Sequence, residues 1–448
     1  MSAPARPWSG RRLHFVGIAG AGMSGYALAA HALGAEVSGS DRAPSPYLEP
    51  LGRAGIAAPA IGHDAGNLPA QGAVELVYST AVPPENPERR AARERGLREL
   101  PRAELLAELT ALRPTIAVAG AHGKTTTAAM IAHVLLGLGL DPAFLIGGIV
   151  RSARANAAWG AGGWLVVEAD ESDRSMLSLD VDIAVLTNVE LDHHVTYRSL
   201  GELREAYRQF LSGPAQAVVW DRPELLELRS GPVVAFEPQQ VALTAGGSRF
   251  DWRGHQVRLG VPGVMNARNA AAALEACALA GTDPAAACAA LSDFAGTARR
   301  FERVGRTPQG ADVYDDYAHH PTELVATLEA ARTLDGGRLV AAFQPHLYSR
   351  TAHLAREFGA ALSLADLIVV LDVYAARERA EDFPGVSGLL VARAAADVAG
   401  GRTVVWAPAL KDAERALVQL LRQRDTLLTL GAGDIDALAG ALVKERPA

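Results

Sequence analysis

The chain has 448 residues, 49% of them hydrophobic, and a formal net charge of −7. This length predicts two to four domains, each with enough apolar residues to form a core. The acidic balance argues against a nucleic-acid surface, which needs concentrated basic residues. Two cysteines, Cys277 and Cys288, give no disulfide framework. Gly281 and Pro284 should break the chain into separate helices between them, so we expect free thiols in a reducing cytosol.

The apolar stretches are too short or too interrupted to predict a membrane anchor. A run near the N-terminus follows Arg11 and Arg12, but His14 and His31 interrupt it, so a secretory signal is not expected. The run 128–140 is rich in glycine and shorter than a membrane-spanning helix. We therefore expect a cytoplasmic protein without stable membrane insertion.

Strands and helices alternate along the whole chain, which predicts α/β domains with parallel sheets. We place three domains at 1–110, 111–298 and 299–448. The first and third are expected to be Rossmann-like and the central one to be a parallel-sheet domain of the P-loop ATPase type. The expected strands, in chain order, are 13–18, 36–40, 76–79, 115–119, 164–168, 183–187, 217–220, 313–314, 339–343, 367–371, 403–406 and 426–429. The expected helices include 24–33, a part of 87–95, 269–280, 321–334 and 410–424.

A glycine loop follows the first expected strand. Gly20-Ala-Gly22-Met-Ser-Gly25 fits the Gly-x-Gly-x-x-Gly pattern, which places a pyrophosphate on a helix N-terminus. Asp41 follows the next strand, about where a ribose-binding acid would lie. Taken alone, this pattern predicts NAD(P) binding. A UDP-sugar offers the same diphosphate, so the loop does not specify which nucleotide it binds.

The central domain is expected to begin with a phosphate loop. Lysine occurs only at Lys124, Lys411 and Lys444, and Lys124 lies in Gly120-Ala-His-Gly-Lys-Thr125, between an apolar strand and an apolar helix. This arrangement surrounds a phosphate with backbone N–H groups, a helix N-terminus and an ammonium group. The loop is shorter than a generic Walker A motif. The Thr125 hydroxyl is placed to bind Mg²⁺ on the phosphates.

Acidic and polar residues follow two other strands of this domain. Glu168 comes at the end of one strand, and Asn188, Asp192 and His193 come after the next. In α/β sheets, ligands bind at the carboxyl ends of strands. Hard oxygen ligands with one imidazole near a triphosphate indicate Mg²⁺ sites. Zinc is the weaker interpretation, because no cysteine lies near His193 in the sequence.

The third domain begins with two adjacent arginines and carries four polar loops. Arg299 and Arg300 lie at the expected domain junction, where a guanidinium group can bind phosphate bidentately. The polar loops follow apparent strands, so they are expected to line one face that binds a ligand. They are 314–323, 344–351, 372–377 and 431–434.

Taken together, these residues resemble the Mur ligases, the ATP-dependent amide-forming enzymes of peptidoglycan synthesis. The resemblance runs from about residue 11 to residue 440. Its marks are eight segments in order, at 14–25, 123–127, 168–173, 187–188, 192–193, 299–302, 315–321 and 344–346. It implies that the first domain binds a UDP-sugar, the second binds ATP and the third binds an amino acid.

Within the family, the motifs are most similar to those of the alanine-adding branch. That branch uses ATP to join L-alanine to the lactyl carboxylate of UDP-N-acetylmuramic acid. The resemblance implies two Mg²⁺ ions, and we expect a monomer or dimer with no nucleic-acid partner. No lysine lies between Lys124 and Lys411, so the carbamylated lysine that several relatives use to bridge magnesium is impossible here. Its absence fits the alanine-adding branch.

The resemblance also assigns residues by position. The implied catalytic residues are Lys124, His193, Arg300 and His346. The implied ATP-binding residues are Gly120, Ala121, His122, Gly123, Lys124, Thr125, Thr126, Asn269, Arg300 and Asp316. The UDP-sugar would contact Gly17, Gly20, Gly22, Met23, Asp41, Ser79 and Thr80. The amino acid would lie near His346, Arg350 and Tyr317, and the metal ligands would be Thr125, Glu168 and His193.

The sequence departs from the family pattern at three positions. Many relatives have histidine at Met265, and some have arginine at Leu347, where it would help to hold the amino acid. Ala121 replaces a usual threonine. Three alternatives stay open at this point. They are an NAD(P)-dependent oxidoreductase, a non-catalytic nucleotide switch, and a sister ligase that attaches a recycled tripeptide to UDP-N-acetylmuramic acid.

Overall fold

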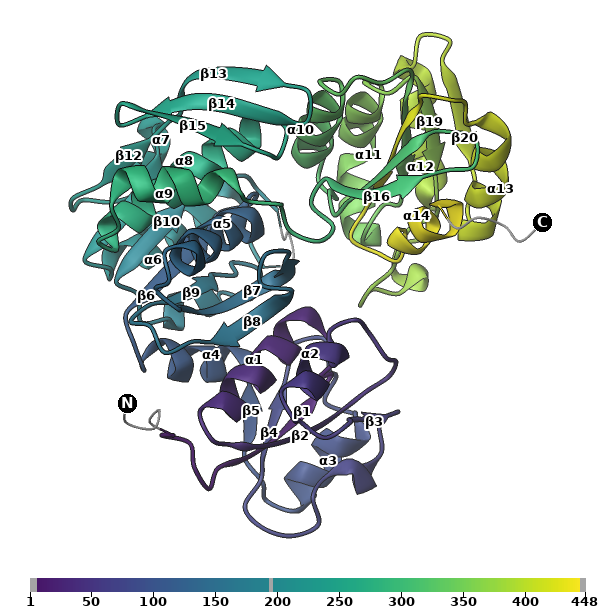
Figure 1. Ribbon diagram of the computed structural model, residues 1–448. Helices are drawn as coiled ribbons and strands as arrows, with labels where there is room; N and C mark the ends of the chain where they lie inside the picture. Colours follow the sequence, from purple (N-terminus) through teal and green to yellow (C-terminus); the bar gives the residue numbers. More distant parts are fainter. Residues whose placement is uncertain (1–5, 193–195, 444–448) are drawn as a thin grey trace. The chain divides into compact units, whose positions relative to one another are not determined.

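The computed structural model describes residues 6–192 and 196–443. The chain divides into two compact units, one formed by residues up to 237 with 268–294, the other by 238–267 with the residues from 295 onward. The strands form four sheets, and the parallel α/β architecture predicted from the sequence is confirmed (Figure 1).

The first sheet of the first unit has five parallel strands, in the order β3-β2-β1-β4-β5. Central strand β1 is buried from Leu13 to Val16 and pairs with β2 on one side and β4 on the other. The strand order therefore reverses at β1, where open α/β sheets bind ligands. The elements are β1 (Arg12–Val16), α1 (Ala21–Ala32), β2 (Glu36–Asp41), α2 (Leu48–Arg53), β3 (Ala60–Ile61), β4 (Glu75–Tyr78), α3 (Pro87–Glu94), β5 (Glu99–Pro101) and α4 (Arg102–Thr110).

The second sheet of this unit has the order β12-β11-β10-β6-β9-β7-β8, and only β8 runs antiparallel to its neighbour. Every residue of β6 is buried, because helices cover both faces of the sheet. The strands are β6 (Thr115–Ala119), β7 (Ala143–Val150), β8 (Ala155–Trp159), β9 (Leu165–Glu168), β10 (Ile183–Leu186), β11 (Gln216–Trp220) and β12 (Val234–Phe236). The helices are α5 (Lys124–Gly137), α6 (Leu200–Ser212), α7 (Pro223–Leu226), α8 (Val264–Leu279) and α9 (Pro284–Ser292).

A small antiparallel sheet of three strands was not predicted from the sequence. It consists of β13 (Gln239–Thr244), β14 (Gly247–Trp252) and β15 (His255–Leu259). Arg253 and Gly254 both have positive φ in the two-residue turn between β14 and β15, as tight hairpins require. Phe250 and Trp252 are buried while Arg249 is exposed, which is the alternation that marks a half-buried strand.

The large sheet of the second unit has the order β16-β17-β21-β18-β19-β20, and all pairs are parallel except β16 with β17. Phe343 of β18 and Phe358 of α11 lie 5.1 Å apart between their ring centroids in one of its cores. The strands are β16 (Glu302–Arg306), β17 (Asp312–Asp316), β18 (Leu339–Phe343), β19 (Leu367–Val370), β20 (Thr403–Trp406) and β21 (Thr426–Leu430). The helices are α10 (Pro321–Ala331), α11 (Tyr348–Leu362), α12 (Gly388–Val398), α13 (Leu410–Leu420) and α14 (Asp436–Val443).

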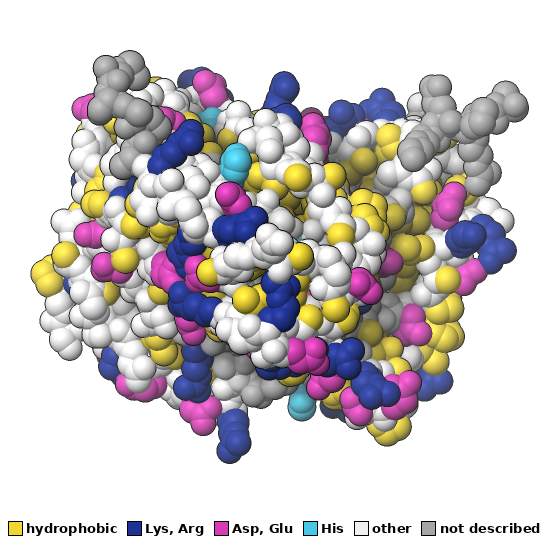
Figure 2. Space-filling view, turned by 90° about the horizontal axis from the view of Figure 1, so that it is seen from below, with side chains coloured by type: hydrophobic (Ala, Val, Ile, Leu, Met, Phe, Trp, Pro, Cys, Tyr) yellow, Lys and Arg dark blue, Asp and Glu magenta, His cyan; other side chains and the backbone are white. Residues whose placement is uncertain are grey.

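Two simpler expectations can also be compared with the structure. Cys277 lies in α8 and Cys288 in α9, and both thiols are free and buried. None of the helices in the described part of the chain combines the length and apolar character needed to cross a bilayer. On the face drawn in Figure 2, basic and acidic side chains are interspersed, in keeping with the small net charge.

Candidate active site

The predicted phosphate loop connects β6 to α5, at the middle of the central sheet. Gly120 and Gly123 both have positive φ, at +132° and +82°. A Cβ atom at Gly120 would overlap the Thr187 hydroxyl, and one at Gly123 would lie 2.5 Å from Asn269 Oδ1. Both glycines are therefore required by backbone conformation and by close packing. The helix N-terminus that follows is available for an anion.

Lys124 begins α5 and its ammonium group is held on two sides. Nζ donates to the carbonyl oxygen of Gly120 at 2.6 Å and lies 2.9 Å from each carboxylate oxygen of Glu171. Burial disfavours the charged ammonium, but the carboxylates of Glu171 and Asp170 outweigh this and raise the pKa of Lys124. Lys124 is therefore a fixed positive charge beside the loop.

Thr125 and Glu168 provide hard oxygen atoms next to this charge. The Thr125 hydroxyl donates to Glu168 Oε2 at 3.0 Å, and the backbone N–H of Gly147 donates to Oε1 at 2.5 Å. The sheet order explains the contact, because β9 lies beside β6 and both strands end at this edge. A hydroxyl and a carboxylate in contact fit the donor set that Mg²⁺ prefers. His193, the third predicted metal ligand, lies outside the described residues.

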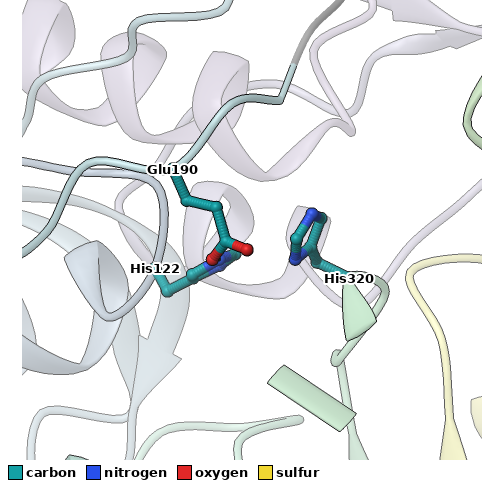
Figure 3. Close-up of side chains that lie close together, drawn as sticks. All are labelled: His122, Glu190 and His320. Carbon is teal, nitrogen blue, oxygen red and sulfur yellow. The ribbon is translucent and has the colours of Figure 1, made fainter. Parts of the chain in front are cut away.

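The other neighbour of the loop is the segment after β10. The Thr187 hydroxyl donates to the His122 carbonyl at 2.6 Å, and Asn188 both donates to that carbonyl and accepts from the His122 N–H. The His122 ring points toward Glu190, with Nε2 2.8 Å from Oε2 (Figure 3). These bonds fix the backbone of the loop.

The remaining residues of this unit that were predicted to bind ATP lie on the same loop or against it. Ala121 accepts from Lys124 Nζ at 3.4 Å through its carbonyl group, and Thr126 is in the first turn of α5. Asn269, which the resemblance assigns to ATP binding, is buried on α8 against the Gly123 turn. Its role in binding the nucleotide stays a prediction.

The predicted UDP-sugar residues gather at the carboxyl edge of the first sheet. Gly17 has φ of +82° directly after β1, and Gly20 and Gly22 lie at the start of α1. Asp41, at the end of β2, accepts from the Ala19 N–H at 2.8 Å and so holds the glycine turn in place. Ser79 and Thr80 follow β4, while Met23 is buried in the hydrophobic core.

Within the same unit, the first two sheets are joined by close packing next to the glycine loop. Strand β8 packs on helix α1 (Figure 1), and a Cβ atom at Gly25 would lie 3.1 Å from Ala157 Cβ. The buried Asn156 side chain donates to the carbonyl of Ala21 and to the Ser24 hydroxyl. The third glycine of the Gly-x-Gly-x-x-Gly pattern thus serves the contact between the two sheets.

In the second unit, the two adjacent arginines have different surroundings. Arg299 donates to Asp315 at 2.9 Å and to the carbonyl oxygens of Gly431 and Gly433, so its guanidinium group holds the fold together. The Arg300 guanidinium lies over the Tyr317 ring, 5.0 Å from its centroid. Asp316, on the same strand end, is buried, and burial raises its pKa to about 6 although Arg300 lowers it.

The residues predicted to bind the amino acid lie together in one cluster of aromatic and charged side chains. Arg350 is buried, with Nη1 3.2 Å from His346 Nδ1. The His319 ring lies edge-on to both Tyr317 and His346, with centroids 5.5 and 5.9 Å apart. The loops after β17 and β18, together with the start of α11, therefore bring Tyr317, His346 and Arg350 together.

Comparison with protein families matches three consecutive segments of the chain. Residues 12–113 match the Mur ligase family catalytic domain, residues 118–277 the Mur ligase middle domain, and residues 299–433 the glutamate ligase domain of Mur ligases. The chain belongs to the Mur ligase family. The three matches confirm the resemblance to the Mur ligases that the sequence motifs indicate.

Curated Mur ligases align along nearly the full length of the chain. UDP-N-acetylmuramate–L-alanine ligase of Rubrobacter xylanophilus is 42% identical over 441 residues, which are 95% of this chain and 97% of that protein. The enzyme of the same name from Renibacterium salmoninarum is 44% identical over 454 residues, 96% and 95% of the two chains.

Solved Mur ligase structures have the same fold. The UDP-N-acetylmuramate–alanine ligase of Thermotoga maritima superposes with a TM-score of 0.83 at 28% identity, covering 96% of this chain and 98% of that one. A murein peptide ligase of Psychrobacter arcticus has a TM-score of 0.72 at 24% identity, covering 98% and 100%, and supports the fold alone.

Two carboxylates of the site were not assigned roles from the sequence. Glu171 pairs with Lys124, and Glu190 pairs with His122. Glu171 lies in the same acidic segment after β9 as Glu168, so the sequence did contain a signal for it. What the pattern could not give is which acid faces the lysine and which faces Thr125.

Proposed function

We propose that this Mur ligase joins L-alanine to the lactyl carboxylate of UDP-N-acetylmuramic acid at the expense of ATP. The observation that carries the proposal is the site at the centre of the second sheet. There a phosphate loop with a fixed ammonium group lies beside a hydroxyl–carboxylate pair, Thr125 with Glu168. Full-length relatives at 42% and 44% identity are named for this activity.

In the proposed reaction, the lactyl carboxylate attacks the γ-phosphate of ATP and forms an acyl phosphate. The amine of alanine then attacks the carbonyl carbon, and phosphate leaves through a tetrahedral intermediate. The N–H groups of the phosphate loop and Lys124 bind the β- and γ-phosphates and stabilise the charge that develops there. No nucleophile of the enzyme is needed, so catalysis comes from positioning and from charge neutralisation.

Thr125 and Glu168 would hold Mg²⁺, with His193 as the proposed ligand of a second ion. The metal would neutralise phosphate charge when bound. The Gly147 N–H keeps the partly buried Glu168 carboxylate in place for this. Arg300 is proposed to contact the phosphates, and Tyr317, His346 and Arg350 to line the amino-acid site, with His346 as a candidate base.

Two further properties belong to the proposal. ATP and a UDP-sugar as substrates favour a cytoplasmic location, and the enzyme is proposed to act as a monomer or dimer without a nucleic-acid partner. The tripeptide-recycling alternative is less well supported. The full-length relatives above carry the alanine-adding name, whereas the murein peptide ligase is only 24% identical.

The test is phosphate release from ATP with Mg²⁺ and UDP-N-acetylmuramic acid, with L-alanine, glycine, L-serine or the tripeptide L-Ala-D-Glu-diaminopimelate offered in turn. We expect release that depends on L-alanine and a product heavier by one alanine residue. Release only with the tripeptide would assign the protein to the recycling branch. Nucleotide binding without release for any acceptor would support the non-catalytic switch instead.

A further inference from the structure

Arg102 lies where the first two sheets of the first unit meet, and it has no role in the proposed reaction. It begins helix α4. Its Nη2 atom donates to Asp170 Oδ2 at 2.8 Å and to Asp173 Oδ2 at 3.1 Å, in the loop that follows β9. One guanidinium nitrogen thus ties α4 to the acidic loop that also carries Glu171, the partner of Lys124.

The other guanidinium nitrogen is directed toward the glycine loop. A Cβ atom at Gly22 would lie 3.8 Å from Arg102 Nη1, so this nitrogen is next to the first turn of α1. Within residues 6–192 and 196–443, Nη1 has no hydrogen-bond partner and no side chain caps the N-terminus of α1. Two kinds of donor, a guanidinium N–H and helix N–H groups, therefore face the same place.

We propose that Arg102 binds the diphosphate of the UDP-sugar through Nη1 while Nη2 keeps it anchored on Asp170 and Asp173. This inference rests on the proposed function, since it requires a UDP-sugar at the glycine loop. A guanidinium group carries N–H donors on separate nitrogens, so it can bind two anions at once, and the single nitrogen of a lysine ammonium group does not reproduce this. Arg102 then connects the diphosphate with the loop that holds the ATP-binding lysine.

The proposal also assigns a role to Asp173, one of the two carboxylates that hold Arg102. Its carboxylate belongs to the loop after β9, where it accepts a hydrogen bond from Arg102 Nη2. Loss of its charge leaves the guanidinium group with one ionic partner in place of two. Asp173 is therefore a positioning residue, and its replacement should weaken diphosphate binding in part.

The experiment compares UDP with uridine, because the two ligands differ only in the diphosphate. Binding to the full chain would be measured by calorimetry for UDP and by ligand-observed NMR for uridine. For Arg102→Met we expect UDP affinity to fall at least about tenfold, the loss of one charge-assisted contact, with uridine affinity unchanged. Arg102→Lys and Asp173→Asn should give smaller losses for UDP alone. Arg98→Met removes the same charge from a half-exposed residue paired with Glu75, and should bind both ligands like the wild type.

The outcomes separate this inference from the function on which it rests. If the wild type binds neither UDP nor UDP-N-acetylmuramic acid, the proposed function fails. If the wild type and Arg102→Met bind UDP with equal affinity, Arg102 does not contact the diphosphate. The same conclusion follows if Arg102→Met loses affinity for UDP and for uridine by the same factor. Should Arg102→Met not fold, Arg102→Lys decides the question, since wild-type affinity for UDP in that variant would overturn the proposal.

Discussion

Both carboxylate oxygens of Glu171 lie 2.9 Å from the ammonium nitrogen of Lys124. The Glu171 side chain is only 3% exposed, so the acidic partner of this ion pair is buried. The lysine of the phosphate loop is thus also a structural cation. Its replacement should affect stability as well as turnover.

Lys124→Met should lower turnover at least about a hundredfold, because a donor to the developing phosphate charge is lost. The same change should destabilise the protein by about 3 kcal/mol or more, since it removes the cation from a buried carboxylate. Thermal unfolding and phosphate release measure the two effects. Adding Glu171→Gln should restore much of the stability and none of the turnover. Equal unfolding midpoints for Lys124→Met and the wild type would contradict the structural role.

Thr125→Val should raise the Mg²⁺ concentration needed for half-maximal turnover by about tenfold or more, because a hydroxyl beside Glu168 is lost. Thr125→Ser keeps the hydroxyl and should stay close to the wild type. Thr127→Val is the matched control on the same helix, since the buried Thr127 hydroxyl has no partner among the described residues. A Mg²⁺ requirement that Thr125→Val leaves unchanged would remove Thr125 from the metal site.

The positions of most strands could be predicted because buried parallel strands are continuous apolar runs that end at glycine or polar loops. β6 has the predicted bounds, and β18 and β20 also match. Strand β13 and its neighbours β14 and β15 were missed, because their alternating residues resemble a polar loop unless the Arg253-Gly254 turn is recognised first. The short strand β16 was missed because three of its five residues are exposed and the other two are only partly buried.

The candidate site was predictable where the residue type fixes the chemistry and not where the fold selects a partner. Lys124, Thr125 and Glu168 could be assigned because a phosphate loop and a strand end determine their places. The pairing of His122 with Glu190, and of Arg102 with Asp170, depends on contacts between segments far apart in sequence. Spacing along the chain carries no information about such contacts.

Glu88→Gln should destabilise the first sheet by about 3 kcal/mol at neutral pH, since it breaks a buried charge-assisted network. The Glu88 carboxylate contacts His14 at 2.8 Å, Ser40 at 2.7 Å and Asn67 at 3.1 Å. Burial alone would raise its pKa, but these hydrogen bonds outweigh burial and lower it to about 2.

The folded-state pKa of Glu88 lies below the unfolded value of 4.5, so this stabilisation is complete above pH 4.5 and is lost as the pH falls toward 2. The difference in unfolding free energy between wild type and Glu88→Gln should therefore shrink across that window. Denaturant titrations at several pH values measure it. The exposed Glu49→Gln is the control and should show no such trend. A difference that stays constant down to pH 3 would mean that the charge on Glu88 does not stabilise the fold.

Asp316 should give the opposite pH dependence in the second unit. Its carboxylate accepts from the N–H groups of Phe301 at 2.7 Å and Ala318 at 2.8 Å, yet burial dominates and raises its pKa to about 6 from 3.8. Between these two values the folded form keeps the proton and the unfolded form releases it. The contribution of Asp316 to stability is thus greatest below pH 3.8 and is lost as the pH rises through 6.

Asp316→Asn should remove this part of the pH dependence, because an amide does not titrate. The difference in unfolding free energy, wild type minus variant, is expected to fall by about 2.5 kcal/mol between pH 4 and pH 7. Asp312→Asn, on the same strand, is the matched control. Bonds to Arg303 and Arg306 lower the pKa of Asp312 although burial opposes them, so its effect lies below pH 4. If Asp316→Asn and the wild type lose stability in parallel over pH 4 to 7, the carboxylate of Asp316 is already ionised at pH 4, and the low-dielectric surroundings inferred for it at the end of β17 are absent.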